Sequence, residues 1–201
     1  MVPHRQSHIT DLHWQLATRL DNAVLDADTR YWLLDDGSLS ARLDAVSGGH
    51  FSVARLAQGW RTPLLSEQRL LQLGERKRAL IREVELRCHG QPVVFARSVF
   101  PVEALTGSLR HLRQLNNESL GSLLFANPAM RRTPFEVAAI DGNSNYLPAH
   151  LHQSAPCWGR RSRFSINGKS LLVSEVFLQS FTPWPRQCSH HRAERGKIGA
   201  C

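Results

Sequence analysis

The stretch WGRRSRFSINGKSLLVSEVFL, residues 158–178, decides the fold of this chain. Asn167 and Gly168 separate two runs of strand-forming residues, and Asn-Gly between two such runs is the strongest short-range signal for a β-hairpin. With these two residues as the loop, Arg160 on the first strand lies directly opposite Glu175 on the second. The stretch therefore predicts an antiparallel hairpin that holds two opposite charges side by side.

The two faces of this hairpin differ in character. The face of Arg160 and Glu175 is mainly apolar near its middle, with Phe164, Leu171 and Val173, so it is predicted to face the core and to point Glu175 inward. An ionised carboxylate there is costly unless something pairs with it. A three-residue loop would instead set Arg161 opposite Glu175. The other face is predicted to face solvent and carries Arg161, Arg163, Ser165, Ser170 and Ser174.

A second hairpin is predicted at ALIREVELRCHGQPVVFARSVFP, residues 79–101. Side chains of a strand alternate between faces, and one set in the first strand is mostly charged and belongs in water: Ile81, Glu83, Glu85 and Arg87. The other set then faces the core and includes Arg82 among the apolar residues Val84, Leu86 and Cys88. Arg82 is thus a second charge on an inward face.

Arg82 and Glu175 allow two interpretations. They form a buried structural ion pair, or they line a pocket. Buried ion pairs stabilise weakly, because desolvation offsets the Coulomb attraction. The planar guanidinium of Arg82 matches a carboxylate, so a pocket with both residues would suit a small ligand with a carboxylate at one end and a hydroxyl at the other.

The remaining elements favour an α+β class with an antiparallel sheet. A short helix is predicted in residues 26–38, with Asp28 or Thr29 as its N-cap, and the following residues 39–46 continue the helical region. Another helix is predicted in 116–125, with Asn117 or Ser119 as its cap. Strands are predicted in residues 50–60 and 133–140 and a loop in 141–157.

Composition narrows the function classes. The 201 residues suit one domain, and no apolar run approaches the ~20 residues of a membrane span, so the cytoplasm is the expected compartment. The net charge of +8 would suit nucleic acid or an anionic small molecule. The tryptophans form no stacking series among basic residues, which argues against RNA binding. The four cysteines form no CxxC pair, so free thiols are expected rather than a metal site.

Taken together, these residues resemble the chorismate lyase family. The resemblance runs in chain order through residues 32–178, and WGRRSR followed by GK-x-LL-x-x-E-x-F is its most specific part. The matching blocks are WLLDDGSLSARL, IREVELRCHGQPVVFARSVFP, SLGSLLF, WGRRSRF and GKSLLVSEVFL.

The resemblance implies a lyase that eliminates pyruvate from chorismate to give 4-hydroxybenzoate, the first committed step toward ubiquinone. It implies a single α+β domain over 1–178, with helices packed to one side of an antiparallel sheet, followed by a basic tail over 179–201. It also implies a monomer with a small-molecule substrate, no metal or organic cofactor, and no nucleic-acid partner.

The resemblance also assigns site residues. Arg82 would clamp the ring carboxylate, together with the main-chain amides of Leu39 and Leu120, and Glu175 would lie near the ring hydroxyl. Arg160 is the residue expected to neutralise the side-chain carboxylate of chorismate. The chain departs from the family pattern in a longer 141–157 loop, which would alter access, and in the tail. The main alternative is a non-catalytic sensor of small aromatic acids, of the UTRA type, which has the same fold; such regulators carry a winged-helix domain, and about 30 residues before the matching region are too few for one.

Overall fold

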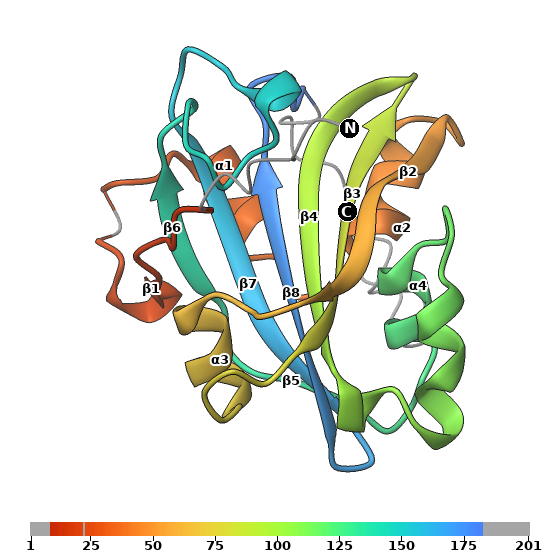
Figure 1. The fold of residues 1–201 in the computed structure, drawn as a ribbon. Helices are drawn as coiled ribbons and strands as arrows, with labels where there is room; N and C mark the ends of the chain where they lie inside the picture. The colour runs from red at the N-terminus through yellow and green to blue at the C-terminus, as the bar shows by residue number, and fades with distance from the viewer. Residues whose placement is uncertain (1–8, 22, 183–201) are drawn as a thin grey trace, which may run out of the picture.

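The computed structural model describes residues 9–21 and 23–182. Within them the chain forms an antiparallel sheet with short helices on both of its faces (Figure 1). The strands are β1 (Gln15–Leu16), β2 (Phe51–Arg61), β3 (Ala79–Cys88), β4 (Gln91–Pro101), β5 (Met130–Arg132), β6 (Glu136–Ile140), β7 (Cys157–Ile166) and β8 (Lys169–Phe177). The α-helices are α1 (Ala27–Leu33), α2 (Leu39–Val46), α3 (Leu65–Leu71) and α4 (Leu120–Phe125), and the 3-10 turns include Gly107–Gln114 and Ala149–Leu151.

The strand order places the two predicted hairpins side by side in the middle of the sheet. The order is β1-β6-β7-β8-β4-β3-β2, and β5 pairs with β7 beside this path. Every recorded strand pair is antiparallel. The α+β class with an antiparallel sheet is therefore confirmed.

The β7–β8 hairpin has the predicted two-residue turn. Asn167 and Gly168 adopt φ angles of 49° and 77°, the left-handed conformation that such a turn requires and that asparagine and glycine tolerate. The Cα partners run from Ile166–Lys169 at the turn to Trp158–Phe177 at the far end, with Arg160 opposite Glu175. The predicted register is confirmed, and the three-residue loop is excluded.

Helices α1, α2 and α4 begin at side-chain caps. The Asp26 side chain accepts hydrogen bonds from the backbone N–H groups of Asp28 and Thr29, so α1 begins earlier than the predicted caps Asp28 and Thr29. Ser38 caps α2, which makes it a separate helix rather than a continuation of α1. Ser119 caps α4, as predicted. A short polar side chain at each start satisfies an N–H that has no partner within the helix.

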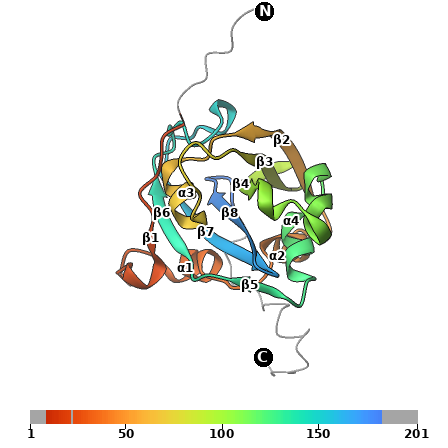
Figure 2. The ribbon, with the colours of Figure 1, turned by 60° about the horizontal axis from the view of Figure 1, so that its bottom comes forward.

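Both faces of the sheet are covered. This corrects the prediction that one face of each hairpin is exposed to solvent. Helices α1, α2 and α4 pack on the face of Arg82 and Glu175, as expected, but α3 and the 141–156 loop pack on the opposite face (Figure 2). On that opposite face Glu85, Ser174 and Ile81 are almost wholly buried. The prediction failed because charged and serine side chains look exposed in a sequence, while here Ser174 is buried and Glu85 is buried with Arg87 and His150 as its partners.

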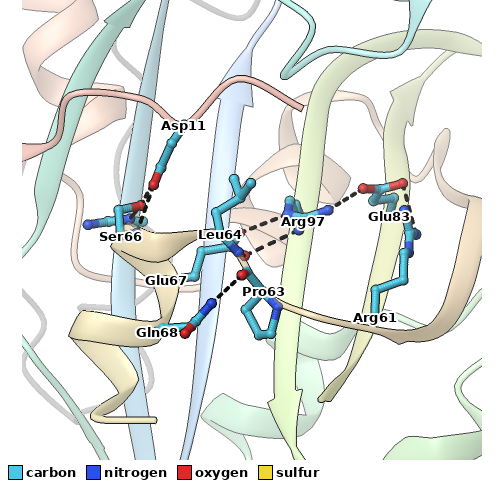
Figure 3. Close-up of polar contacts among 10 residues, drawn as sticks. Asp11, Arg61, Pro63, Leu64, Ser66, Glu67, Gln68, Glu83 and Arg97 are labelled. Atoms are coloured by element: carbon cyan, nitrogen blue, oxygen red, sulfur yellow. Dashed lines mark hydrogen bonds and ion pairs between the residues drawn. The ribbon is translucent and has the colours of Figure 1, made fainter. Parts of the chain in front are cut away.

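Arg97 is the centre of a buried ion network on the α3 face (Figure 3). Its guanidinium donates to both carboxylate oxygens of Glu67 on α3, at 2.7 and 3.2 Å, and to Glu83 on β3 at 2.5 Å. Arg61 on β2 also pairs with Glu83, at 3.4 Å. Burial lowers the pKa of Arg97, but Glu67 and Glu83 outweigh it and the net shift is upward. The network therefore ties α3 to the strands beneath it.

In the loop between β6 and β7, the backbone at Gly142 lies very close to that of Gln153 and Ala155. A Cβ atom added there would lie 2.2 Å from the carbonyl oxygen of Gln153 and 2.6 Å from that of Ala155. The carbonyl oxygen of Gly142 also accepts a hydrogen bond from the N–H of Gln153 at 3.1 Å. Glycine is therefore needed here for the close approach of two backbone segments.

The described fold continues past Leu178 to Thr182. Phe181 is fully buried, and its ring packs edge-on against Trp32 at 5.1 Å and Phe177 at 5.0 Å between centroids. The first residues of the expected tail thus belong to the core. The rest of that tail, 183–201, lies outside the described residues.

Candidate active site

A small cavity lies between the sheet and the helices α2 and α4. Its volume is about 30 Å³, comparable to the space that one water molecule occupies in the liquid. The α2 side contributes Leu39 and Ser40, and the α4 side contributes Gly121 and Leu124. The other lining residues are Gly37, Phe125, Arg132, Phe135, Arg160, Arg161, Ser162, Phe164, Val173 and Glu175.

Glu175 lies in the cavity wall and pairs with Arg160. The Arg160 Nε donates to Glu175 Oε2 at 2.6 Å, while its Nη1 donates to the backbone oxygens of Trp32, Leu33 and Asp35 at 2.9 to 3.2 Å. The Arg160 side chain is 2% exposed and that of Glu175 is 19% exposed. Arg160 thus fixes the carboxylate to the end of α1.

Arg82 is buried on the same face of the sheet but does not line the cavity. Its Nη2 donates to the carbonyl oxygens of Asn116 and Glu118 at 2.9 Å each, just before α4. Its Nε is buried without a hydrogen-bond partner among the described residues. The pKa of Arg82 is lowered to about 10, because burial and the nearby charge of Arg55 lower it and outweigh the opposing charge of Glu118.

The structure rules out a direct ion pair between Arg82 and Glu175. The recorded partner of Glu175 is Arg160, and those of Arg82 are carbonyl oxygens. An arginine that is 2% exposed with one unpaired N–H donor is costly. Of the two interpretations from sequence, this arrangement favours a ligand pocket.

Leu39 and Leu120 are the first residues of α2 and α4. The backbone N–H groups in the first turn of a helix have no acceptor within that helix. Leu39 lines the cavity, while Leu120 lies just before the lining residue Gly121. Of the four expected site residues, Leu39 and Glu175 line the cavity. Leu120 and Arg82 lie beside it, near α4, and do not line it.

Sequence reasoning missed Arg132 and Ser162, both of which line the cavity. The Ser162 hydroxyl is buried with no hydrogen-bond partner in the described part of the chain. The register does put Ser162 on the face of Arg160, so its position could have been read from the hairpin. Arg132 lies on β5, a strand too short to show alternation in a sequence.

Two features are absent from the described residues. They contain no helix long and apolar enough to cross a membrane. They also contain no group of three or more histidine, cysteine, aspartate or glutamate side chains that could hold a metal ion. Cys157 is buried, which raises the pKa of its thiol to about 11.

Solved structures share the α+β fold of this chain. It is similar to the effector domain of PhnF from Mycobacterium smegmatis, with a TM-score of 0.52 and 15% identity, over 73% of this chain and 91% of that one. It is also similar to a PhnF C-terminal domain, with a TM-score of 0.53 and 14% identity, over 65% and 84% of the two chains. At these identities the likeness shows the fold alone.

Sequence comparison then identifies the family. The family model described as chorismate lyase matches residues 9–187. A Pseudomonas putida protein named "Probable chorismate pyruvate-lyase" is 45% identical over 82% of this chain and 84% of its own length. A Methylococcus capsulatus protein with the same name is 43% identical over 77% of this chain and 96% of its own length. The chain belongs to the chorismate lyase family.

Proposed function

We propose that this protein eliminates pyruvate from chorismate to give 4-hydroxybenzoate. The observation that carries the proposal is the placement of Arg82 and Glu175, the two charged residues of the family pattern, on the face of the sheet that α1, α2 and α4 cover. They come from different hairpins and have different partners, so each is free to meet one end of an aromatic acid.

The reaction needs few chemical groups. The ether bond between the ring and the enolpyruvyl oxygen breaks, and its electron pair leaves with the enolpyruvate. A proton leaves the ring carbon that bears the hydroxyl, so the ring becomes aromatic and supplies the driving force. The enolpyruvate takes up a proton and becomes pyruvate. The protein must mainly hold the substrate in a reactive conformation and stabilise the charge that develops on the leaving oxygen.

Each proposed site residue has one role in this reaction. The unpaired Nε of Arg82 would donate to the ring carboxylate, and the first-turn N–H groups of Leu39 and Leu120 would complete that site. Glu175 would accept a hydrogen bond from the ring hydroxyl while Arg160 holds its other side. Glu175 then acts on the proton that leaves the ring, or it orients the hydroxyl.

Substrate entry requires α2 and α4 to separate. A cavity that binds benzene in a protein interior has a volume of about 150 Å³, while this one has about 30 Å³. The two helices pack closely where Gly121 approaches Ser38 and Ser40. We propose that they open to admit the substrate and close over it, which would exclude water from the reacting atoms. We further propose that a single chain supplies the whole site and that the protein acts as a monomer.

Purified protein incubated with chorismate tests the proposal. Formation of 4-hydroxybenzoate and pyruvate in equal amounts, above the rate in buffer alone, is the expected result. Binding of 4-hydroxybenzoate by calorimetry without any turnover would instead favour the sensor alternative. If the protein neither turns over chorismate nor binds 4-hydroxybenzoate, both the lyase function and the sensor function are contradicted.

A further inference from the structure

Arg132 is a half-buried arginine in the cavity wall. It is the last residue of β5 and pairs with Phe164 on β7. Paired residues of neighbouring strands point to the same face, and Phe164 itself lines the cavity. The side chain of Arg132 therefore lies on the face of Glu175.

Among the residues that the structure describes, Arg132 differs from the two other arginines of the cavity in having no polar partner. Arg160 is bound to Glu175 and to backbone carbonyls. Arg161 points to the α3 face, where it donates to Glu136 at 2.7 Å and Ser66 at 2.8 Å. Within residues 9–21 and 23–182, no hydrogen bond or ion pair is recorded for the Arg132 guanidinium; its recorded contact is the ring of Phe135, 4.1 Å from the guanidinium carbon.

The charges around Arg132 leave room for an anion. Burial lowers the pKa of Arg132 first, and the nearby charge of Arg160 lowers it further. The charges of Glu175, Asp36 and Asp35 act in the opposite direction, although none of these three carboxylates forms an ion pair with Arg132. Glu175 is already paired with Arg160, and Asp35 with Arg42 at 3.3 Å. A cation in such surroundings gains more from an added carboxylate than an exposed one does.

We propose that Arg132 binds the carboxylate of the enolpyruvyl group, the second carboxylate of chorismate. This inference rests on the proposed function and replaces Arg160, the residue expected from sequence, because Arg160 has committed its Nε and Nη1 donors to Glu175 and α1. Arg132 is thus a substrate-binding residue that the product 4-hydroxybenzoate does not engage.

The chemistry of the substrate places this carboxylate near Arg132. The enolpyruvyl ether is attached to the ring carbon next to the one that bears the hydroxyl. If the hydroxyl meets Glu175, the ether leaves the ring beside Glu175, in the part of the cavity where the charge of Glu175 acts on Arg132. A guanidinium there also faces the leaving group, whose negative charge grows as the ether bond breaks.

The test compares Arg132→Gln with Arg131→Gln. Arg131 is the neighbouring residue on β5, is exposed, and donates to backbone oxygens of Pro128 and Met130. Three quantities are measured for each variant: kcat and KM for chorismate, the Kd of 4-hydroxybenzoate, and the Kd of 3-(carboxymethoxy)-4-hydroxybenzoate. The last compound is a stable aromatic acid that carries a second carboxylate on an ether at the same ring position.

Arg132→Gln is expected to raise KM for chorismate and the Kd of the dicarboxylate by about 10- to 100-fold, the range of a lost charge-assisted hydrogen bond. It should leave the Kd of 4-hydroxybenzoate within about 2-fold, and Arg131→Gln should change none of the three. Equal weakening of both aromatic acids would show a structural role and overturn the inference, as would unchanged values for the dicarboxylate. A wild-type protein that binds both acids without turning over chorismate would sink the proposed function while leaving the binding comparison able to decide on Arg132.

Discussion

Arg160 and Arg161 are neighbours in the sequence and serve opposite faces of the sheet. Successive residues of a strand point to opposite sides, so Arg160 holds Glu175 at the cavity while Arg161 holds Glu136 and Ser66 near α3. Gly159, just before them, is equally constrained, because an added Cβ would lie 2.8 Å from Ile140 Cδ1. The WGRRSR stretch therefore places Arg160 and Ser162 on the cavity face and uses Gly159 and Arg161 to pack the far face.

Arg82→Lys should weaken 4-hydroxybenzoate binding by roughly 1.5–3 kcal/mol, because the compact ammonium of lysine cannot reach both carbonyl oxygens and the ring carboxylate at once as the planar guanidinium does. Calorimetric titration of the product measures the change. Arg55→Lys is the matched control, since Arg55 is exposed and lies close enough to lower the pKa of Arg82. Wild-type affinity in Arg82→Lys would place the carboxylate clamp elsewhere.

Glu175→Gln should lower kcat by about 100-fold or more while product affinity changes little. The amide can still accept a hydrogen bond from the ring hydroxyl, but it cannot take a proton. Arg160 remains held by three backbone carbonyls of the α1 segment, so the wall of the cavity should persist. Glu136→Gln removes the corresponding partner of Arg161 and should leave kcat unchanged. Normal turnover in Glu175→Gln would make this carboxylate purely structural.

The two hairpins show what a sequence predicts well. The Asn-Gly turn and the alternation of residues were enough to pair Arg160 with Glu175, because register depends on local turn geometry. Helix α3 was missed because residues 61–74 have no clear periodicity, and its position depends on the contact between Glu67 and Arg97, which are 30 residues apart. Long-range pairs of this kind leave no local signal.

Gly121 controls how closely α2 and α4 approach each other. A Cβ atom there would lie 3.3 Å from Ser40 Oγ and 3.5 Å from Ser38 Oγ. Gly121→Val should hold the helices apart, and stopped-flow measurement should show 4-hydroxybenzoate dissociating about 10-fold faster or more. Ser122→Val adds the same side chain at an exposed position of α4 and should leave dissociation unchanged. Slower or equal release in Gly121→Val would show that these helices do not gate the cavity.

At the scale of the molecule, the sequence predicted the class and the central strands but not the second covered face. The charged and serine residues on one side of each hairpin suggested a solvated face where the structure has buried ions, since the type of a residue does not show whether it has a buried partner. The site was predicted only in part. Glu175 follows from the register of its hairpin, whereas Arg132 reaches the cavity only through the pairing of β5 with β7, which lies far away in the sequence.

Two truncations test where the folded domain ends. Removal of residues 183–201 keeps Phe181 and should leave kcat and Tm close to those of the full chain, within a few-fold for kcat. Removal of 179–201 also deletes Phe181, whose ring fills the space between Trp32 and Phe177, and should cost about 3–5 kcal/mol of unfolding free energy. Thermal melts and chorismate assays on both truncations decide. Loss of activity with unchanged Tm in the shorter deletion would assign the last residues to the site.

The close approach of two backbone segments at Gly142 affects how the results of a saturation mutagenesis survey of this protein should be interpreted. Any side chain there meets the backbone oxygens of Gln153 and Ala155 at less than van der Waals distance, so most substitutions would deplete from a selected library as strongly as changes at Glu175. Yet Gly142 does not line the cavity. The two positions would be distinguished only if protein abundance is measured as well as growth. Variants at Gly142 would be depleted from the cell, whereas Glu175→Gln would accumulate as folded protein without activity.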